Sequence, residues 1–274
     1  MSHEMVDYFR NAFQNIEFPI ETEITPTSRT SFYRAMDISL MYRGHPNVLS
    51  RSMEEFLKSN CRPFAYAGAA KVLMLSSYIS SREYDDYGLQ ASREWLSIAR
   101  QDVTRCFEIE LIHGEIEQAS NKLDNIKSNL DELNTFDEAK DSYYVALLNM
   151  FYHSKRKQRG EEQKWEDIAE RLAENDYQKL FVINGKAGNF IQDKKWSDAA
   201  KHYEQVIAID KQDPWAWHNV SLCYLHLNDL KNAERCNEIA LVLMDFGAAR
   251  QVQQMIQQRK TGSFFSRLKH LFSG

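Results

Sequence analysis

Two consecutive stretches decide the fold, WSDAAKHYEQVIAID at residues 196–210 and WAWHNVSLCYLHLNDLKNAERCNEIAL at residues 215–241. When the chain is shifted by 34 residues, segment 180–213 falls on segment 214–247. Small residues then align with small ones and aromatic residues with aromatic ones at helical spacing, as in the pairs Ala187 and Ser221, Phe190 and Tyr224, and Ala199 and Ala233. Small residues let two helices approach closely. The recurrence therefore predicts stacked two-helix hairpins.

Within each unit, the first helix carries a large, a small and an aromatic residue in turn, and an alanine comes early in the second helix. This order resembles the tetratricopeptide repeat (TPR) family over residues 180–247. The resemblance implies an all-α solenoid of helical hairpins whose first helices line a concave groove for peptides or partner helices. Lys186 and Asn237 depart from the pattern, because the family prefers apolar residues there.

The hairpin pattern continues upstream in weaker form. Residues 143–148 with 165–172 resemble a third repeat, and 63–75 with 87–99 resemble a fourth that begins with a long helix. Residues 247–260 are expected to form the capping helix that such arrays need. We therefore divide the chain into an N-terminal helix and extended arm (1–30), degenerate repeats with a long heptad helix (31–134), TPR-like repeats with their cap (135–260) and a basic tail (261–274).

A heptad pattern predicts one long central helix over 103–134. Its apolar positions are spaced alternately by three and four residues, as in a coiled coil. The two alternatives are a spine inside the chain and a homodimer seam in a self-associating scaffold. The seam residues are Ile109, Ile112, Ile116, Ala119, Leu123, Ile126, Leu130 and Leu133.

The resemblance also implies which residues face the groove. They are Phe181, Asn184 and Ile191 in one repeat, and Trp215, His218, Leu222, Leu225 and His226 in the next. The chaperone-binding branch of the family grips a terminal carboxylate with lysines and asparagines, whereas this chain offers only Asn184 at those places. An apolar, aromatic groove instead suits the hydrophobic face of a helix or an extended segment. The alternative is that these side chains pack on a neighbouring helix of the same chain.

The C-terminal stretch SFFSRLKHLFSG (263–274) predicts a short basic amphipathic helix, separated from the cap by Thr261-Gly262. Such a helix lies on anionic membranes, docks in a groove or folds back on the chain. Its membrane-binding or docking residues are Phe264, Phe265, Arg267, Leu268, Lys269, Leu271 and Phe272.

Composition also limits the fold classes and functions that are open to this chain. The 274 residues include only 10 Gly and 5 Pro, which argues against an all-β fold, and the net charge of −5 argues against nucleic-acid binding. Ten acids and three bases lie in 107–142, whereas 247–274 holds five bases and no acid. The sequence contains no phosphate-binding, nucleophile-elbow or zinc motif, and its four cysteines have no paired spacing. We therefore expect a cytoplasmic, non-enzymatic adaptor that needs no cofactor or metal.

Overall fold

The computed structural model describes the backbone of residues 2–41, 46–80, 83–103 and 105–272, and side chains over the same ranges except 2, 78–80, 83 and 262–272. Two short strands, β1 (Tyr78–Ser80) and β2 (Glu83–Tyr84), pair antiparallel. A 3-10 helix covers Asp137–Asp141. The α-helices are α1 Ser2–Gln14, α2 Pro26–Leu40, α3 Pro46–Lys58, α4 Arg62–Ser76, α5 Asp86–Gln101, α6 Phe107–Ala119, α7 Leu123–Leu133, α8 Tyr143–Lys155, α9 Arg159–Leu172, α10 Asp176–Gln192, α11 Trp196–Ile209, α12 Pro214–His226, α13 Leu230–Leu243 and α14 Gly247–Phe272.

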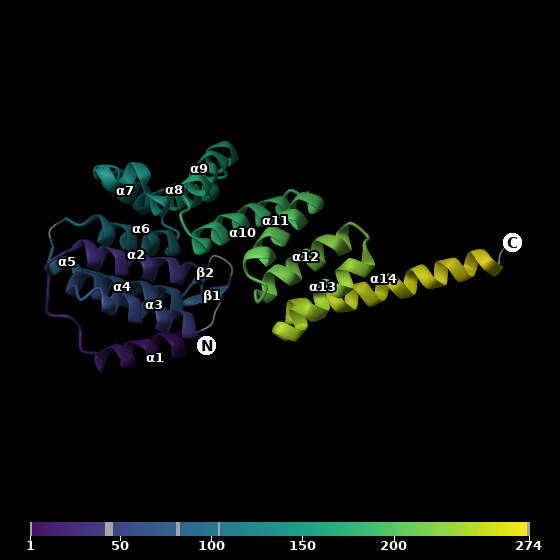
Figure 1. The fold of residues 1–274 in the computed structure, drawn as a ribbon, viewed down its shortest axis with the longest axis horizontal. Helices are drawn as coiled ribbons and strands as arrows, with labels where there is room; N and C mark the ends of the chain where they lie inside the picture. Colours follow the sequence, from purple (N-terminus) through teal and green to yellow (C-terminus); the bar gives the residue numbers. More distant parts are fainter. Residues whose placement is uncertain (1, 42–45, 81–82, 104, 273–274) are drawn as a thin grey trace. The chain divides into compact units, whose positions relative to one another are not determined.

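The helices form antiparallel hairpins (Figure 1). The pairs α2/α3, α4/α5, α6/α7, α8/α9 and α12/α13 pack against each other along the chain, which confirms the predicted all-α hairpin repeat. The chain divides into two compact units, unit 1 (Met1–Gln178) and unit 2 (Lys179–Gly274). The division falls inside α10 and not at residue 134, where the sequence pattern changes.

Helix α4 is the centre of unit 1. Almost all of its residues are buried, and it packs against α1, α2, α3, α5 and α6. Gly68 is required for one close contact, because a Cβ atom there would lie 2.2 Å from the Phe56 ring. The rings of Phe56 and Phe64 in turn lie 5.4 and 4.8 Å from that of Phe32 on α2. An apolar sequence with small residues therefore makes α4 the core helix that the other hairpins cover.

A left-handed residue ends the first helix of four hairpins. Asn121, Lys157, Lys194 and Asn228 have φ between 58° and 62°. After three of these residues, the amide of the following residue donates to the carbonyl oxygen five positions before it in the helix. An example is Asp229 N, which donates to Tyr224 O at 2.9 Å. This is the Schellman arrangement, which stops a helix and satisfies its last carbonyl groups. The repeats thus share one joint geometry, although glycine, the usual residue at such a joint, occupies none of these four positions.

The predicted single helix over 103–134 is wrong. Helix α6 ends at Ala119, Asn121 adopts φ 58°, and α7 begins at Leu123 and packs back on α6. Six of the eight seam residues are buried inside unit 1. They are Ile109, Ile112, Ile116, Ile126, Leu130 and Leu133, each at most 4% exposed. Of the other two seam residues, Ala119 is half-buried and Leu123 is 38% exposed. The heptad pattern therefore describes two facing helices of one hairpin, and it leaves no continuous seam for a second copy.

Four of the ten acidic side chains in the segment 107–142 pair with bases from earlier helices. Each of four glutamates on α6 forms an ion pair with a different base on α2, α4 or α5. The pairs are Glu108 with Arg29, Glu110 with Arg100, Glu115 with Lys71, and Glu117 with Arg93. The charge asymmetry of the sequence therefore reflects packing within unit 1 as much as an exposed acidic surface.

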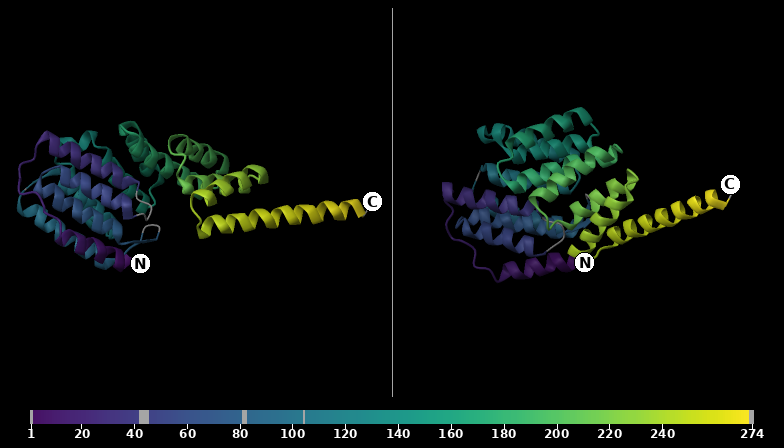
Figure 2. Two further views of the ribbon diagram at one scale, coloured as in Figure 1. Left: turned by 60° about the horizontal axis from the view of Figure 1, so that its bottom comes forward. Right: turned by 45° about the vertical axis from the view of Figure 1, so that its right-hand side comes forward.

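Helix α14 differs from the prediction of a cap and a separate tail. It runs without a break from Gly247 to Phe272, through Thr261-Gly262 (Figure 2). Its first half packs on α12 and α13 through Ala249, Val252 and Ile256, which are buried. A glycine lowers helix stability by only about 1 kcal/mol, which does not force an end to a helix.

Candidate functional site

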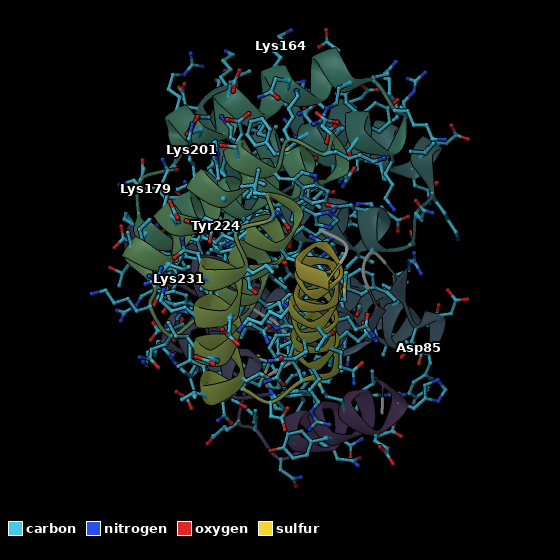
Figure 3. The ribbon with its side chains drawn as sticks, turned by 90° about the vertical axis from the view of Figure 1, so that its right-hand side faces the viewer. Asp85, Lys164, Lys179, Lys201, Tyr224 and Lys231 are labelled. Atoms are coloured by element: carbon cyan, nitrogen blue, oxygen red, sulfur yellow. The ribbon has the colours of Figure 1, made fainter. Side chains whose placement is uncertain are left out.

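Helix α12 positions the residues that the sequence predicted for a groove. Pro214 occupies its first turn, and Asp213 caps it by accepting from the amides of Trp215 at 2.8 Å and Ala216 at 3.1 Å. The helix contains no Lys, Arg, Asp or Glu. The neighbouring helices α11 and α13 carry exposed lysines, such as Lys201 on α11 and Lys231 on α13 (Figure 3). Helix α12 therefore offers aromatic and aliphatic groups where its neighbours offer charge.

Three aromatic rings meet at the start of α12. Trp215 is 36% exposed, and its ring lies 4.4 Å from Phe246 and 6.0 Å from His218. His218 is 7% exposed, and its Nδ1 has no hydrogen-bond partner within the described part of the chain. Burial lowers the pKa of His218, so the ring is held neutral. We call Trp215, His218 and Phe246 the aromatic cluster.

Sequence reasoning missed Phe246. This residue lies in the joint between α13 and α14, outside every helical repeat pattern, so periodicity gave no signal for it. A large apolar residue between two helices was the only available indication, and the structure shows that its half-buried ring covers Trp215 and His218.

Leu225 is not a surface residue. It is fully buried and packs with Ala233, Val252 and Ile256, and half-buried Leu222 contacts the same cluster. The prediction that Leu225 faces a partner is therefore wrong, because the first half of α14 covers this end of α12. Trp217 supports the helix instead: its Nε1 donates to Lys211 O at 3.0 Å.

The other groove candidates are more accessible. His226 is exposed and stacks on Trp196 of α11, with ring centroids 3.8 Å apart and an interplanar angle of 4°. On α10, Phe181, Asn184 and Ile191 are all half-buried. Asn184 donates to Leu180 O of its own helix at 2.9 Å, which leaves its oxygen for another donor. These positions are compatible with the predicted surface, which remains a prediction.

The tail residues Phe264, Phe265, Arg267, Leu268, Lys269, Leu271 and Phe272 lie on the helical backbone of α14, but their side chains are outside the described residues. Among the helices of the described residues, none combines the length and apolar character needed to cross a membrane.

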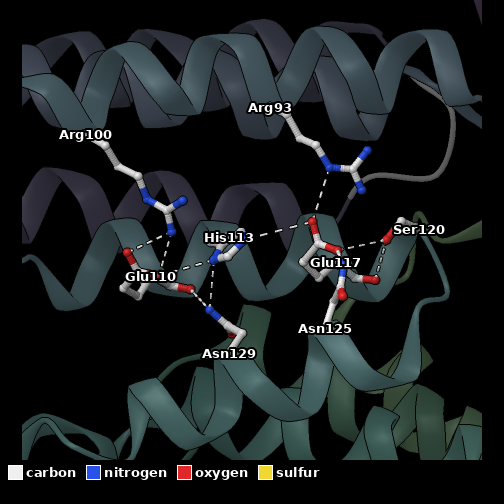
Figure 4. Close-up of polar contacts among 8 residues, drawn as sticks. All are labelled: Arg93, Arg100, Glu110, His113, Glu117, Ser120, Asn125 and Asn129. Atoms are coloured by element: carbon white, nitrogen blue, oxygen red, sulfur yellow. Dashed lines mark hydrogen bonds and ion pairs between the residues drawn. The ribbon is translucent and has the colours of Figure 1, made fainter.

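Unit 1 contains a polar network that includes acids of the segment 107–142 (Figure 4). Arg100 of α5 binds both carboxylate oxygens of Glu110 at 2.7 and 2.8 Å, and His113 Nδ1 lies 3.2 Å from Glu110 Oε2. Burial alone raises the pKa of Glu110, but the bonds from His113 and Arg100 outweigh it and lower the pKa below its usual value. Glu110 is therefore an ionised structural group.

About two helical turns further on, Glu117 is held in the same way. Burial raises its pKa, but Asn125 Nδ2, which donates at 2.7 Å, and Arg93 Nε, at 3.2 Å, lower it overall. His113 Nε2 lies 3.9 Å from Glu117 Oε1. A carboxyl group whose pKa is lowered holds no proton near neutral pH, so neither glutamate is suited to general-acid catalysis. The network links α5, α6 and α7.

The four cysteines are also packing residues. Cys61, Cys106, Cys223 and Cys236 are buried and free, and burial raises the pKa values of Cys106 and Cys223 to about 12, which makes them poor nucleophiles. Within the described residues, no group of three or more His, Cys, Asp or Glu side chains is arranged to hold a metal ion.

Buried Asp37 on α2 connects three helices through hydrogen bonds. Its carboxylate accepts from Tyr144 at 2.5 Å, Gln178 at 2.9 Å and Asn175 at 2.7 Å. Burial raises its pKa although these three donors oppose that shift. At 9% exposure it is covered from solvent, and it fixes the start of α10 to α2 and α8.

Comparison with known proteins agrees with this architecture. Segments of the chain are similar to the Hsp70-Hsp90 organizing protein 2 of Arabidopsis thaliana (36% identical over 58 residues, 20% of this chain and 10% of the relative) and to the mitochondrial import receptor subunit TOM70 of Saccharomyces cerevisiae (32% over 71 residues, 26% and 11%). These matches span about a tenth of each relative. The crystal structure of yeast Tom70 superposes with a TM-score of 0.53 at 12% identity, over 96% of this chain and 59% of that one.

The fold is a TPR-like solenoid of helical hairpins. No family model matches it. At 12% identity the likeness to Tom70 establishes the helical-repeat fold alone. Within this TPR-like fold, α12 and α13 form the hairpin whose sequence carries the repeat pattern most clearly, and α14 occupies the capping position.

Proposed function

We propose that this protein with a TPR-like fold is a non-enzymatic adaptor that holds an apolar segment of another protein against the exposed side of α12, with Trp215 as its main anchor. The observation that carries the proposal is the aromatic cluster, in which an exposed tryptophan adjoins a buried, neutral histidine with an unpaired ring nitrogen. Tryptophan is enriched among the residues that dominate binding energy at protein interfaces.

The cluster also indicates the chemistry of the partner. The absence of charged side chains on α12 favours an apolar face over an acidic or basic peptide. His218 is buried beside Trp215, so it supports the tryptophan ring and leaves Trp215 as the exposed contact for a partner. The partner is therefore a helix or extended segment with at least one large apolar side chain that packs on Trp215.

By name, one relative organises Hsp70 and Hsp90, and the other is a subunit of a mitochondrial import receptor. Both descriptions concern proteins that work with other proteins. By analogy, we assign a protein partner to this chain, with the chemistry given above.

The test compares Trp215→Asp with Val242→Asp. Val242 is 86% exposed on α13, so the control adds the same charge to unit 2 outside α12. Tagged chains are recovered from the cells that make the protein, and co-purifying proteins are quantified. Loss of one or more partners with Trp215→Asp alone, at unchanged helical circular dichroism, is expected. Equal recovery with both variants would refute the proposed anchor.

A second candidate function rests on the length of α14. The helix continues 12 residues beyond Lys260 through a sequence that is basic and apolar. We propose that this extension recruits the protein weakly to anionic membranes. Co-sedimentation with phosphatidylserine vesicles should pellet the full chain more than a chain that ends at Lys260. Equal pelleting would remove this function and leave the α12 proposal untouched.

A further inference from the structure

Helix α1 lies on unit 1 in the manner of a bound ligand. Its apolar side chains Val6, Phe9 and Phe13 are spaced by three and four residues, and each is at most 3% exposed. They pack against Leu49 and Met53 of α3, Ala69, Val72 and Leu73 of α4, and Ala91 and Trp95 of α5. We call this surface of α3, α4 and α5 the α1 seat. Anchors with this spacing are the way an amphipathic helix occupies a groove.

The seat has a defined edge as well as an apolar floor. Tyr87 on α5 receives a hydrogen bond from Arg10 Nη1 at 2.7 Å and donates one to Asp7 Oδ1 at 2.6 Å. Both bonds are exposed to solvent, and a further contact joins the exposed imidazole of His3 to the half-buried carboxylate of Asp85. Exposed polar contacts contribute little to stability, so the three apolar anchors carry most of the docking.

Contacts that do not involve α1 join the helices of the seat. Helix α4 packs on both α3 and α5, and α4 and α5 also pack on α6, whereas α1 packs on α4 and α5. After α1, residues 17–25 form no regular secondary structure. Phe18 of this arm stacks on Tyr66 of α4 at 4.5 Å and extends the apolar contact. Residues 2–18 are therefore the occupant, and the rest of the arm is its tether.

From this arrangement we infer that α1 is an exchangeable internal ligand, and that the α1 seat binds an amphipathic helix of another protein when α1 leaves it. The helix that fits has large apolar side chains at positions i, i+3 and i+7. It also carries an acid at i+1 and a base at i+4, which reproduce the contacts of Asp7 and Arg10 with Tyr87. This surface lies in unit 1 and is independent of the α12 site proposed above.

The test uses the full chain and a fluorescent peptide of residues 2–18 as the probe. Phe9→Ala/Phe13→Ala weakens the internal helix, and Tyr8→Ala/Asn11→Ala is the control, because both of its positions are exposed. Fluorescence anisotropy should show at least 10-fold tighter peptide binding to the first variant than to the wild type or the control. A peptide with both phenylalanines replaced by aspartate should not bind.

Equal peptide affinity for the folded Phe9→Ala/Phe13→Ala variant and the wild type would overturn the inference. If that variant loses its helical circular dichroism, the wild-type chain is incubated with a photo-crosslinking form of the same peptide. Crosslinks to α3, α4 or α5 then support exchange, and their absence overturns it. A wild-type dimer in sedimentation velocity that the variant abolishes would assign the seat to a second copy and overturn its assignment to another protein.

Discussion

At the scale of single residues, Asn237 on α13 is a buried polar side chain without hydrogen-bond partners among the described residues. It is 1% exposed, and neither its Nδ2 nor its Oδ1 has a hydrogen-bond partner within the described residues. A buried polar group without a partner costs about 1–3 kcal/mol. We expect Asn237→Leu to raise the free energy of unfolding by about 1–2 kcal/mol in urea titrations. The control is Asn149→Leu, which loses the bond to Val145 O and should destabilise the chain; a stabilised control would contradict the reasoning.

His218 gives unit 2 a dependence on pH. Because burial lowers its folded pKa, the unfolded chain binds a proton at higher pH than the folded chain does. Stability contributed by the neutral ring is thus present above the unfolded value of about 6.5 and is lost as the pH falls below it. His218→Phe should flatten the unfolding free energy measured by urea titration between pH 7 and 5.5. An unchanged slope would show that His218 is not the titrating group.

Sequence periodicity placed several site residues correctly but not their exposure. The 34-residue register put Trp215, His218 and Leu225 on the helix that the structure shows. Exposure, however, depends on what covers each turn of that helix, and α14 buries Leu225 while Phe246 shields His218. A repeat pattern records which face is apolar, and it does not record where the capping helix or a loop residue comes to rest.

At the scale of the elements, the central hairpin shows why a heptad can mislead. The spacing from Ile109 to Leu133 stays in register across the turn, so the pattern alone cannot distinguish one helix from two. Asn121 was the available signal, because asparagine tolerates left-handed φ better than most residues. The hairpins themselves were predictable, since length, apolar period and repeat register all agreed.

Gly114 allows α6 and α7 to approach. A Cβ atom there would lie 2.3 Å from Asn129 Oδ1 and 2.8 Å from Leu148 Cδ1, whereas one at Gly160 on α9 would meet nothing within 4 Å. Gly114→Ala should therefore lower the free energy of unfolding by about 1–3 kcal/mol through overpacking, despite the better helix propensity of alanine. Gly160→Ala, the matched control, should be neutral or stabilising by up to about 1 kcal/mol. Thermal melts of both variants check this, and equal shifts would exclude a close approach at Gly114.

At the scale of the whole molecule, contacts are concentrated within units 1 and 2, and α10 is the helix that contains their boundary. Ion pairs such as those of Glu108 and Glu117 join helices of unit 1, and the apolar cluster around Leu225 joins helices of unit 2. In repeat proteins, each hairpin is stabilised mainly by its neighbours, so a local defect need not spread through the array.

This organisation predicts that a core mutation in one unit lowers the protection of backbone amides from hydrogen exchange in that unit alone. Leu225→Ala and Leu73→Ala each remove a fully buried side chain, the first from unit 2 and the second from α4 in unit 1, and each should cost about 2–5 kcal/mol locally. In hydrogen–deuterium exchange, Leu225→Ala should speed exchange in α12–α14 and leave α4 protected, because local opening follows cooperative units. Leu73→Ala should do the reverse. If either variant accelerates exchange equally in α4 and α12, the chain unfolds as one cooperative block and the division at residue 178 has no energetic meaning.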